Sequence, residues 1–167
     1  GNPDYHTNTN KGKGLPDSRD IIACEHLLAS WKCAFTGNDE GFLFNTAAAL
    51  HAVQDKDAHL DYGPLYNGFH FIMGTIFYGN GKYYSWLDDP YSEDVFTIKS
   101  NPTTFSSRGI NTLRNTEYVL RIQKPFYDIM MAKDRPVIVE SICGAWILEC
   151  ISSMGLVQEE AIRFGGM

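Results

Sequence analysis

The chain has 167 residues, of which 44% are apolar and 13% aromatic, so it can bury a sizeable core without disulfide or metal support. A formal net charge of −6 argues against a nucleic-acid binder, because such proteins cluster Lys and Arg to neutralise phosphates, whereas the 14 basic residues here are scattered. The apolar stretches fall short of the roughly 20 residues that span a bilayer, so we expect no transmembrane segment.

The chain begins with a polar segment, residues 1–16, which is expected to be a flexible arm rather than a signal peptide. Asp17 or Ser18 can cap the helix that follows. Apolar residues then recur at spacings of three and four, which places them on one helix face: Ile21, Cys24, Leu28, Trp31 and Phe35. Gly37 is expected to end this helix, because glycine readily adopts the left-handed conformation of a helix C-terminus.

Residues 42–53, with three consecutive alanines, predict a second and shorter helix. After a polar loop, residues 69–87 become aromatic and β-branched and are interrupted by Asn80-Gly81, a dipeptide that favours a tight turn between antiparallel strands. The sequence therefore predicts a β-hairpin there. Further strands are expected at 95–99, 117–123, 136–141 and 145–151, and a closing helix at 157–164.

Two segments near the predicted strands are expected to be irregular. Residues 101–115 contain Pro, Ser and Gly, which favour a loop. Pro125 cannot donate to a strand ladder, so residues 125–134 are expected to turn. The predicted fold class is α+β, with N-terminal helices packed on one face of a mostly antiparallel sheet of five to six strands, in a single domain over residues 17–167.

Four cysteines could form disulfides or stay free. Cys24 and Cys33 are nine residues apart on the predicted helix and point in opposite directions, and Cys143 and Cys150 are too far apart along one element to bridge. A disulfide would thus join the N-terminal helix to the C-terminal segment, but we expect buried free thiols, because small disulfide scaffolds are richer in cysteine. Cys24 is expected in the core rather than as a nucleophile, since His26 cannot face it at a spacing of two.

Possible metal ligands are concentrated at the end of the second predicted helix and just beyond it. They are His51, Asp55, Asp57, His59 and Asp61, followed by His70. Imidazole and carboxylate groups suit zinc or iron, so His51, His59 and Asp61 form a candidate metal site, with a solvated polar loop as the alternative. The known phosphate-loop, nucleophile-elbow and zinc-protease motifs do not occur, so we assign no catalytic residue and no cofactor.

Aromatic residues gather around the predicted hairpin and turn, beside several carboxylates. They are Tyr83, Tyr84, Trp86, Tyr91, Phe126 and Tyr127, next to Asp88, Asp89 and Asp128. Aromatic walls with a carboxylate suit a pocket for a small amine or a mixed polar and apolar ligand. We therefore predict a small-molecule site with Asp128 as a ligand contact. The alternative is that these aromatic side chains only pack the sheet.

The stretch from Phe71 to Tyr84, followed by Trp86 and an Asp-Asp-Pro loop, resembles the opening hairpin of extracytoplasmic Cache sensor domains, which are PAS-like. The stretch from Pro125 to Ser141 is similar to the segment of that family in which an aromatic-Asp pair leads into a Pro-Val-Ile strand. The resemblance implies an extracytoplasmic ligand-binding sensor domain without catalysis. The residues that it implies for the ligand pocket are Asp128, Tyr127, Tyr84 and Trp86.

Two other functions remain open. Residues 27–39 are similar to the first helix and Gly-Asn-Asp exit of the nuclear-transport-factor-like superfamily, which implies a cone-shaped pocket where His70 or His51 beside a carboxylate performs acid/base work. A structural or interaction module is the other option, and it would expose a large apolar patch. The expected partners are a small-molecule ligand and, as a further option, a second copy of the chain in a homodimer, with no nucleic acid.

Overall fold

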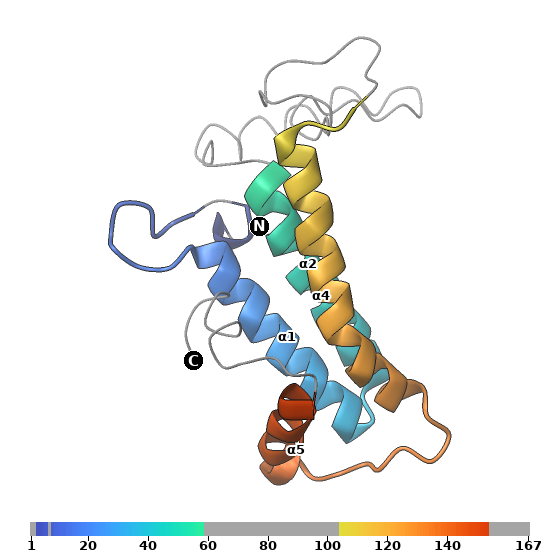
Figure 1. Cartoon of the computed structure of the whole chain (residues 1–167). Helices are drawn as coiled ribbons and strands as arrows, with labels where there is room; N and C mark the ends of the chain where they lie inside the picture. Colours follow the sequence, from blue (N-terminus) through green and yellow to red (C-terminus); the bar gives the residue numbers. More distant parts are fainter. Residues whose placement is uncertain (1–2, 7, 59–103, 154–167) are drawn as a thin grey trace, which may run out of the picture. The chain divides into compact units, whose positions relative to one another are not determined.

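The computed structural model describes residues 3–6, 8–58 and 104–153 (Figure 1). In chain order they form a short 3-10 helix, η1 (Pro3–Tyr5), and four α-helices. The α-helices are α1 (Ser18–Thr36), α2 (Asp39–Ala58), α4 (Ser107–Met131) and α5 (Glu140–Ser153). Within these described ranges the chain contains no β-strand.

The predicted α+β class, with its sheet of five to six strands, is therefore wrong for the described residues. Residues 117–123 lie inside α4, residues 145–151 lie inside α5, and residues 136–141 lead into α5. The PAS-like Cache assignment depended on that sheet and is corrected with it. The predicted hairpin at 69–87, the strand at 95–99 and the closing helix at 157–164 lie outside the described residues.

In α4, the spacing of buried residues outweighs the strand preference of individual residue types. Segment 117–123 contains β-branched and aromatic residues, which favour strands only weakly and depend on their surroundings. In the structure its buried apolar residues follow a helical spacing and continue beyond the predicted strand: Val119, Ile122, Phe126 and Met130. Packing of this face stabilises the helix, because tertiary burial contributes more to helix stability than intrinsic propensity does.

Pro125 was expected to start a turn, but it lies inside α4. A proline in a helix interior removes one hydrogen bond and costs about 3 kcal/mol. Its neighbours Gln123 and Phe126 are 3% and 0% exposed, so burial on either side of the proline offsets that cost. The loop predicted at 101–115 is also wrong from Ser107 onward, where α4 begins.

The sequence predicted α1 and the middle of α2, since the predicted second helix at 42–53 lies inside α2. Asp17 caps α1, as one of the two predicted candidates, because its Oδ1 accepts the backbone N–H of Arg19 at 2.9 Å. Gly37 ends α1 as expected, with φ of 78°, and the N–H of Asn38 donates to the carbonyl of Cys33 at 3.0 Å. The expectation that the second helix is shorter is wrong, since α2 has 20 residues and α1 has 19.

The buried face of α1 is rotated about the helix axis relative to the predicted face. Trp31 and Phe35 are buried as expected, but Ile21, Cys24 and Leu28 are only partly buried. From Ala23 onward, the other buried positions on this helix lie one residue before the predicted ones, at Ala23, Leu27, Ser30 and Ala34. Three of these side chains are small and allow a neighbouring helix to approach closely, which a pattern restricted to large apolar residues does not reveal.

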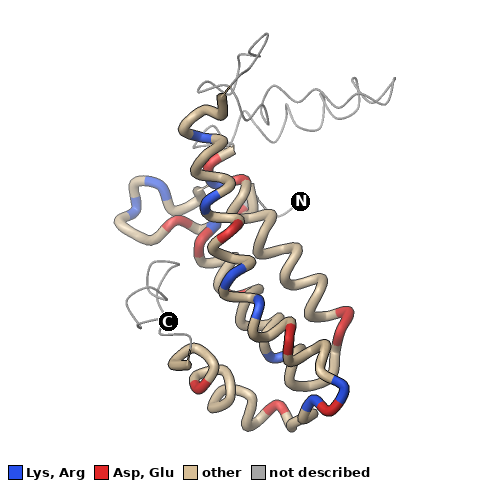
Figure 2. Tube along the Cα trace, turned by 45° about the vertical axis from the view of Figure 1, so that its right-hand side comes forward, with Lys and Arg blue, Asp and Glu red and all other residues tan. Residues whose placement is uncertain are grey.

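The chain divides into two compact units, which are described separately. Unit 1 comprises residues 1–19 and 52–116, and unit 2 comprises residues 20–51 and 117–167. Among the described helices, none combines the length and apolarity needed to cross a membrane. Acidic and basic residues both occur on α1, α2 and α4, whereas α5 carries only acidic ones (Figure 2).

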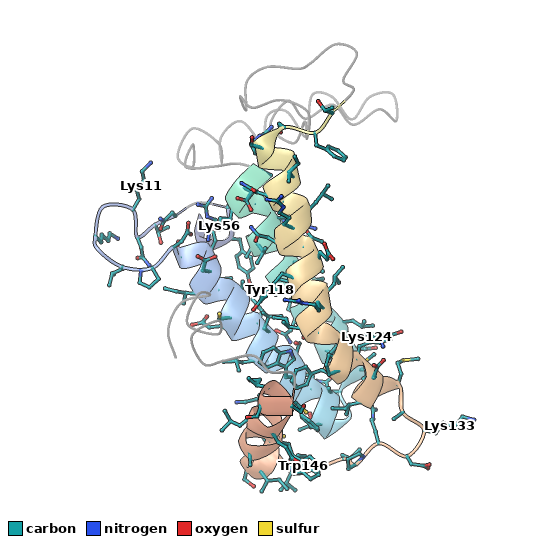
Figure 3. The ribbon with its side chains drawn as sticks, viewed as in Figure 1. Lys11, Lys56, Tyr118, Lys124, Lys133 and Trp146 are labelled. Atoms are coloured by element: carbon teal, nitrogen blue, oxygen red, sulfur yellow. The ribbon has the colours of Figure 1, made fainter. Side chains whose placement is uncertain are left out.

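Unit 2 has an aromatic core between α1, α4 and α5. Trp31 stacks on Phe126 with ring centroids 4.5 Å apart, and Phe35 meets Phe126 edge-on at 6.1 Å. Trp146 of α5 lies with its ring centroid 6.1 Å from that of Phe35 (Figure 3). Aromatic pairs in these geometries add to the stabilisation from buried apolar area, so this cluster defines how the three helices pack.

A buried amide links three helices inside unit 2. Gln123 of α4 accepts a hydrogen bond from the indole Nε1–H of Trp31 on α1. Its Nε2 donates to Ser30 Oγ at 2.9 Å and to Thr46 Oγ1 of α2 at 2.6 Å. The amide oxygen accepts one hydrogen bond and the amide nitrogen donates two, and a satisfied buried network of this kind favours one packing arrangement over others.

Candidate functional site

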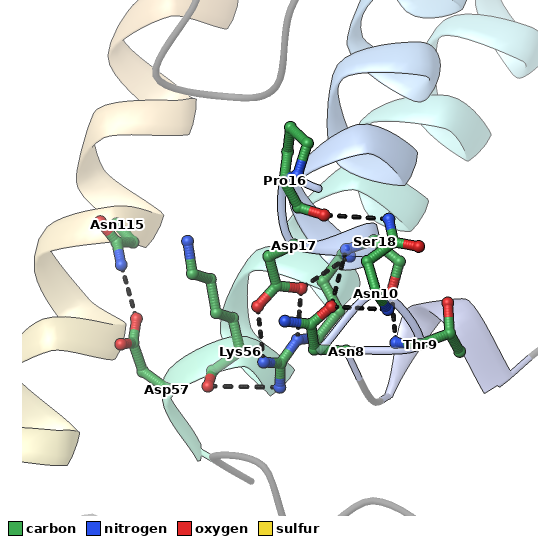
Figure 4. A network of polar contacts seen from close by, with 10 residues as sticks. Asn8, Thr9, Asn10, Pro16, Asp17, Ser18, Lys56, Asp57 and Asn115 are labelled. Carbon is green, nitrogen blue, oxygen red and sulfur yellow. Dashed lines mark hydrogen bonds and ion pairs between the residues drawn. The ribbon is translucent and has the colours of Figure 1, made fainter. Parts of the chain in front are cut away.

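The C-terminal end of α2, in unit 1, gathers polar and charged side chains from several segments (Figure 4). Arg19 is 2% exposed and donates through its guanidinium to both carboxylate oxygens of Asp17, at 3.0 and 2.8 Å. The same side chain donates to the carbonyl of Lys56 at 3.4 Å, and Arg108 donates to the carbonyl of Ala58. Two guanidinium groups therefore meet the last carbonyls of α2, where the helix dipole favours positive charge.

The ionisation of Asp17 is tied to this arrangement. Burial alone would raise the pKa of its carboxyl, but hydrogen bonds and charge from Arg19, with a smaller contribution from Lys56, outweigh burial. The net result is a pKa below the ordinary value of 3.8. Asp17 is therefore ionised at neutral pH, and it serves both as the α1 cap and as the partner of Arg19.

A histidine–carboxylate pair lies on the same part of α2. His6 follows η1, and its Nδ1 is 2.5 Å from Oδ2 of Asp55. Asp55 is 6% exposed, so this contact places a carboxylate and an imidazole together in a largely buried position. Such a pair can orient an imidazole, accept a proton or bind a metal ion.

Hydrogen bonds fix the described part of the predicted N-terminal arm. The backbone N–H of Thr9 donates to Oγ of Ser18 at 2.9 Å, and the hydroxyl of Thr9 donates to Asp4 at 2.6 Å. Asn10 donates to the carbonyl of Pro16 at 2.9 Å (Figure 4). These contacts tie the segment that contains His6 to the start of α1. Flexibility of residues 1–16 stays a prediction.

Of the three residues of the predicted metal site, only His51 lies in the described residues. It is exposed on α2, one helical turn before Asp55. Asp57, from the wider set of candidates, accepts a hydrogen bond from Asn115 at 2.5 Å. His59, Asp61 and His70 lie outside the described residues, so the site formed by His51, His59 and Asp61 stays a prediction.

The predicted small-molecule contacts Asp128 and Tyr127 both lie near the C-terminal end of α4. Asp128 is exposed and accepts from Nζ of Lys124 at 2.6 and 2.5 Å. Tyr127 is 42% exposed, and its ring centroid is 6.5 Å from that of Phe42. Tyr84 and Trp86 lie outside the described residues. Small-molecule binding by these four residues therefore stays a prediction.

The four cysteines are free, as expected. Cys143 is buried, whereas the other three are partly exposed. Burial, followed by the carboxylates of Asp20 and Glu25, raises the pKa of Cys24 to about 12. Burial also raises the pKa of the Cys33 thiol, and a raised thiol pKa disfavours the nucleophilic thiolate. The expectation that Cys24 lies in the core is met only in part, because its side chain is half-buried.

Two features of the structure depend on contacts between distant segments and have no signal in the local sequence. His6 lies in a segment interpreted as an arm, 49 positions from its partner Asp55. Gln123 lies in a predicted strand, and a lone glutamine carries no signal of burial. Spacing did not indicate the Asp17–Arg19 pair either, because residues two apart within a helix do not face each other; Asp17 lies before the first residue of α1, as its cap.

Large apolar side chains are exposed on three helices, with Leu43 and Phe44 on α2 and larger groups on α4 and α5. On α4 they include Leu113, Leu120, Tyr127 and Met131, of which Leu120 is 50% and Met131 61% exposed. On α5 they are Ile142, Trp146 and Leu148, and Val137 and Val139 precede that helix. Scattered apolar residues are common on protein surfaces, but a row along one helix face is typical of a contact surface.

Comparison with protein-family models, with curated proteins and with solved structures found no match to the chain. The comparisons therefore neither confirm nor contradict the resemblances described above.

Proposed function

We propose that this protein is a helical interaction module that pairs with a second copy of itself through α4. The observation that carries the proposal is an exposed apolar row on that helix. Leu113, Leu120 and Tyr127 are spaced by seven residues, and Met131 follows four residues later. Residues at this spacing lie on one helix face and form the seam of paired helices.

Charges within the row favour one orientation of the two copies. Glu117 and Lys124 are exposed and lie three or four residues from Leu120, on the same side of α4. Around a centre between Leu120 and Arg121, an antiparallel pair brings Glu117 of one copy level with Lys124 of the other. A parallel pair in register would instead bring like charges level. The arrangement therefore supports a two-fold, antiparallel dimer.

The existing ion pair of Lys124 does not oppose this arrangement. Lys124 and Asp128 are both exposed, with side chains 67% and 56% accessible. An exposed pair four residues apart on a helix contributes only about 0.3–0.5 kcal/mol. Lys124 can therefore change partners at little cost when a second copy approaches.

The test measures the dissociation constant of the dimer by sedimentation equilibrium over a concentration series. Glu117→Lys and Lys124→Glu should each raise the Kd by at least about tenfold, because each places like charges level twice in the dimer. The double variant should return the Kd to within about threefold of wild type, since it restores opposite charges. Leu120→Glu should leave only monomer, because both copies then bring a carboxylate to the centre of the apolar row.

The matched control is Leu43→Glu, which makes the same change at an exposed leucine of α2. It should leave the Kd unchanged, and circular dichroism should show unaltered helix content in every variant. The proposal fails if the wild-type chain is monomeric at concentrations on the order of 100 µM. It fails equally if the double variant dimerises no better than the single variants.

Small-molecule binding is a separate prediction that the dimer does not require. It depends on the predicted aromatic contacts and on Asp128. The Asp128 carboxylate is exposed on α4 and forms an ion pair with Lys124. An amine ligand would have to replace the ammonium group of Lys124, and such an exchange of cations is chemically reasonable for an exposed carboxylate.

A further inference from the structure

We propose that His6 and Asp55, with His51 of the same helix as Asp55, bind a divalent transition-metal ion such as zinc. The inference is independent of the proposed dimer. It also differs from the site predicted from sequence, because His6 and Asp55 take the places given there to His59 and Asp61. Imidazole nitrogen and carboxylate oxygen are common zinc ligands.

The contact between His6 and Asp55 supplies the first part of the argument. The 2.5 Å separation of Nδ1 and Oδ2 joins the segment after η1 to the last two turns of α2. Two ligands of one ion lie further apart than this, because each is about 2.0–2.2 Å from zinc and tetrahedral geometry separates them. Binding therefore requires only a small side-chain rotation that replaces the hydrogen bond with the ion.

The second part concerns His51. Its position four residues before Asp55 places both side chains on one side of α2, which runs without a break from Asp39 to Ala58. Two ligands at this spacing on a helix are a known way to hold zinc, since one turn brings them to the same ion. Exposure of His51 leaves the position accessible to an ion from solvent.

The candidate ligand atoms also lie close together. One ring nitrogen of His6, one ring nitrogen of His51 and one carboxylate oxygen of Asp55 all lie within 4.8 Å of one another. Asp55 is 6% exposed, so its carboxylate is held in a largely buried position beside the two imidazoles.

The experiment uses the full chain after treatment with a chelator. Co²⁺ is titrated and its d–d absorption recorded, and Zn²⁺ is then added in competition. We expect one equivalent of Co²⁺, displaced by Zn²⁺, and a rise in thermal stability with Zn²⁺, because an ion that binds only the folded chain stabilises it. Asp55→Asn, which keeps the side-chain shape, should weaken binding about ten- to a hundredfold. His6→Ala and His51→Ala should weaken it at least as much.

Two further variants make the outcome decisive. His26→Ala removes a histidine whose Nδ1 lies 2.7 Å from an amide oxygen, that of Asn45, and it should leave Co²⁺ affinity unchanged. His59→Ala separates the two candidate sites, and it should also have no effect. Binding weaker than a Kd on the order of 10 µM would overturn the proposal, as would binding that survives His6→Ala or is lost in His59→Ala. Circular dichroism of each variant shows whether its helices are intact.

Discussion

The contacts inside unit 1 differ in chemistry from the contacts inside unit 2. In unit 2, Trp31, Phe35 and Phe126 pack ring against ring in the core, and polar contacts such as those of Gln123 are embedded between them. In the described part of unit 1, the main contacts are hydrogen bonds and ion pairs at the C-terminal end of α2, with Arg19 as a central donor. Stability of unit 2 should therefore follow buried apolar area, whereas stability of unit 1 should follow pH.

The largest effect should come from the aromatic core. Phe126→Ala should lower the free energy of unfolding by about 3–5 kcal/mol, because Phe126 is fully buried between two aromatic rings and its removal leaves a cavity. Chemical denaturation measures the change. Phe44→Ala, which makes the same change at a phenylalanine of α2 that is 68% exposed, is the matched control and should cost less than about 1 kcal/mol. Equal losses would mean that the Phe126 cluster is not the core of unit 2.

A smaller effect should follow from removing the buried amide. Gln123→Leu should cost about 1–3 kcal/mol, because it leaves the indole N–H of Trp31 buried without its acceptor. Trp31→Phe in the same chain removes that donor, so the double variant should lose less than the sum of the two single losses. A double-mutant cycle by denaturation measures this coupling. Strict additivity would show that the hydrogen bond does not contribute to stability.

The smallest effect should appear in unit 1 and depend on pH. A carboxyl whose folded-state pKa lies below its unfolded value stabilises the fold at higher pH, and that stabilisation is lost as pH falls through the folded-state pKa. Asp17→Asn should therefore reduce the free energy of unfolding at pH 7 by about 1 kcal/mol, since asparagine still caps α1 but cannot pair with Arg19. The difference from wild type should shrink below pH 3.8. Denaturation at a series of pH values tests this, and a difference that is independent of pH would contradict it.

Local signals explain what could be predicted from the sequence. Asp17 and Gly37 mark the ends of α1 because capping and the left-handed turn depend on a few neighbouring residues. The helical state of α4 was missed because Pro125 argues locally for a break, and burial against other helices overrides that preference.

The candidate site shows the same limit. The sequence indicated metal ligands near the end of α2, and Asp55 is among the residues considered there. The partner that the structure gives Asp55 is His6, which no local spacing could indicate because 49 positions separate the two. Long-range contacts of this kind depend on how the chain returns on itself, which composition and periodicity do not encode.

Arg19 has a consequence for how unit 1 opens. Its guanidinium contacts the cap of α1 through Asp17 and the final turn of α2 through the Lys56 carbonyl. Fraying of either helix end would move this side chain and take a hydrogen-bond donor from the other end. The first turn of α1 and the last turn of α2 are therefore coupled in local unfolding. The amide hydrogens at these two helix ends should exchange with solvent through the same opening event.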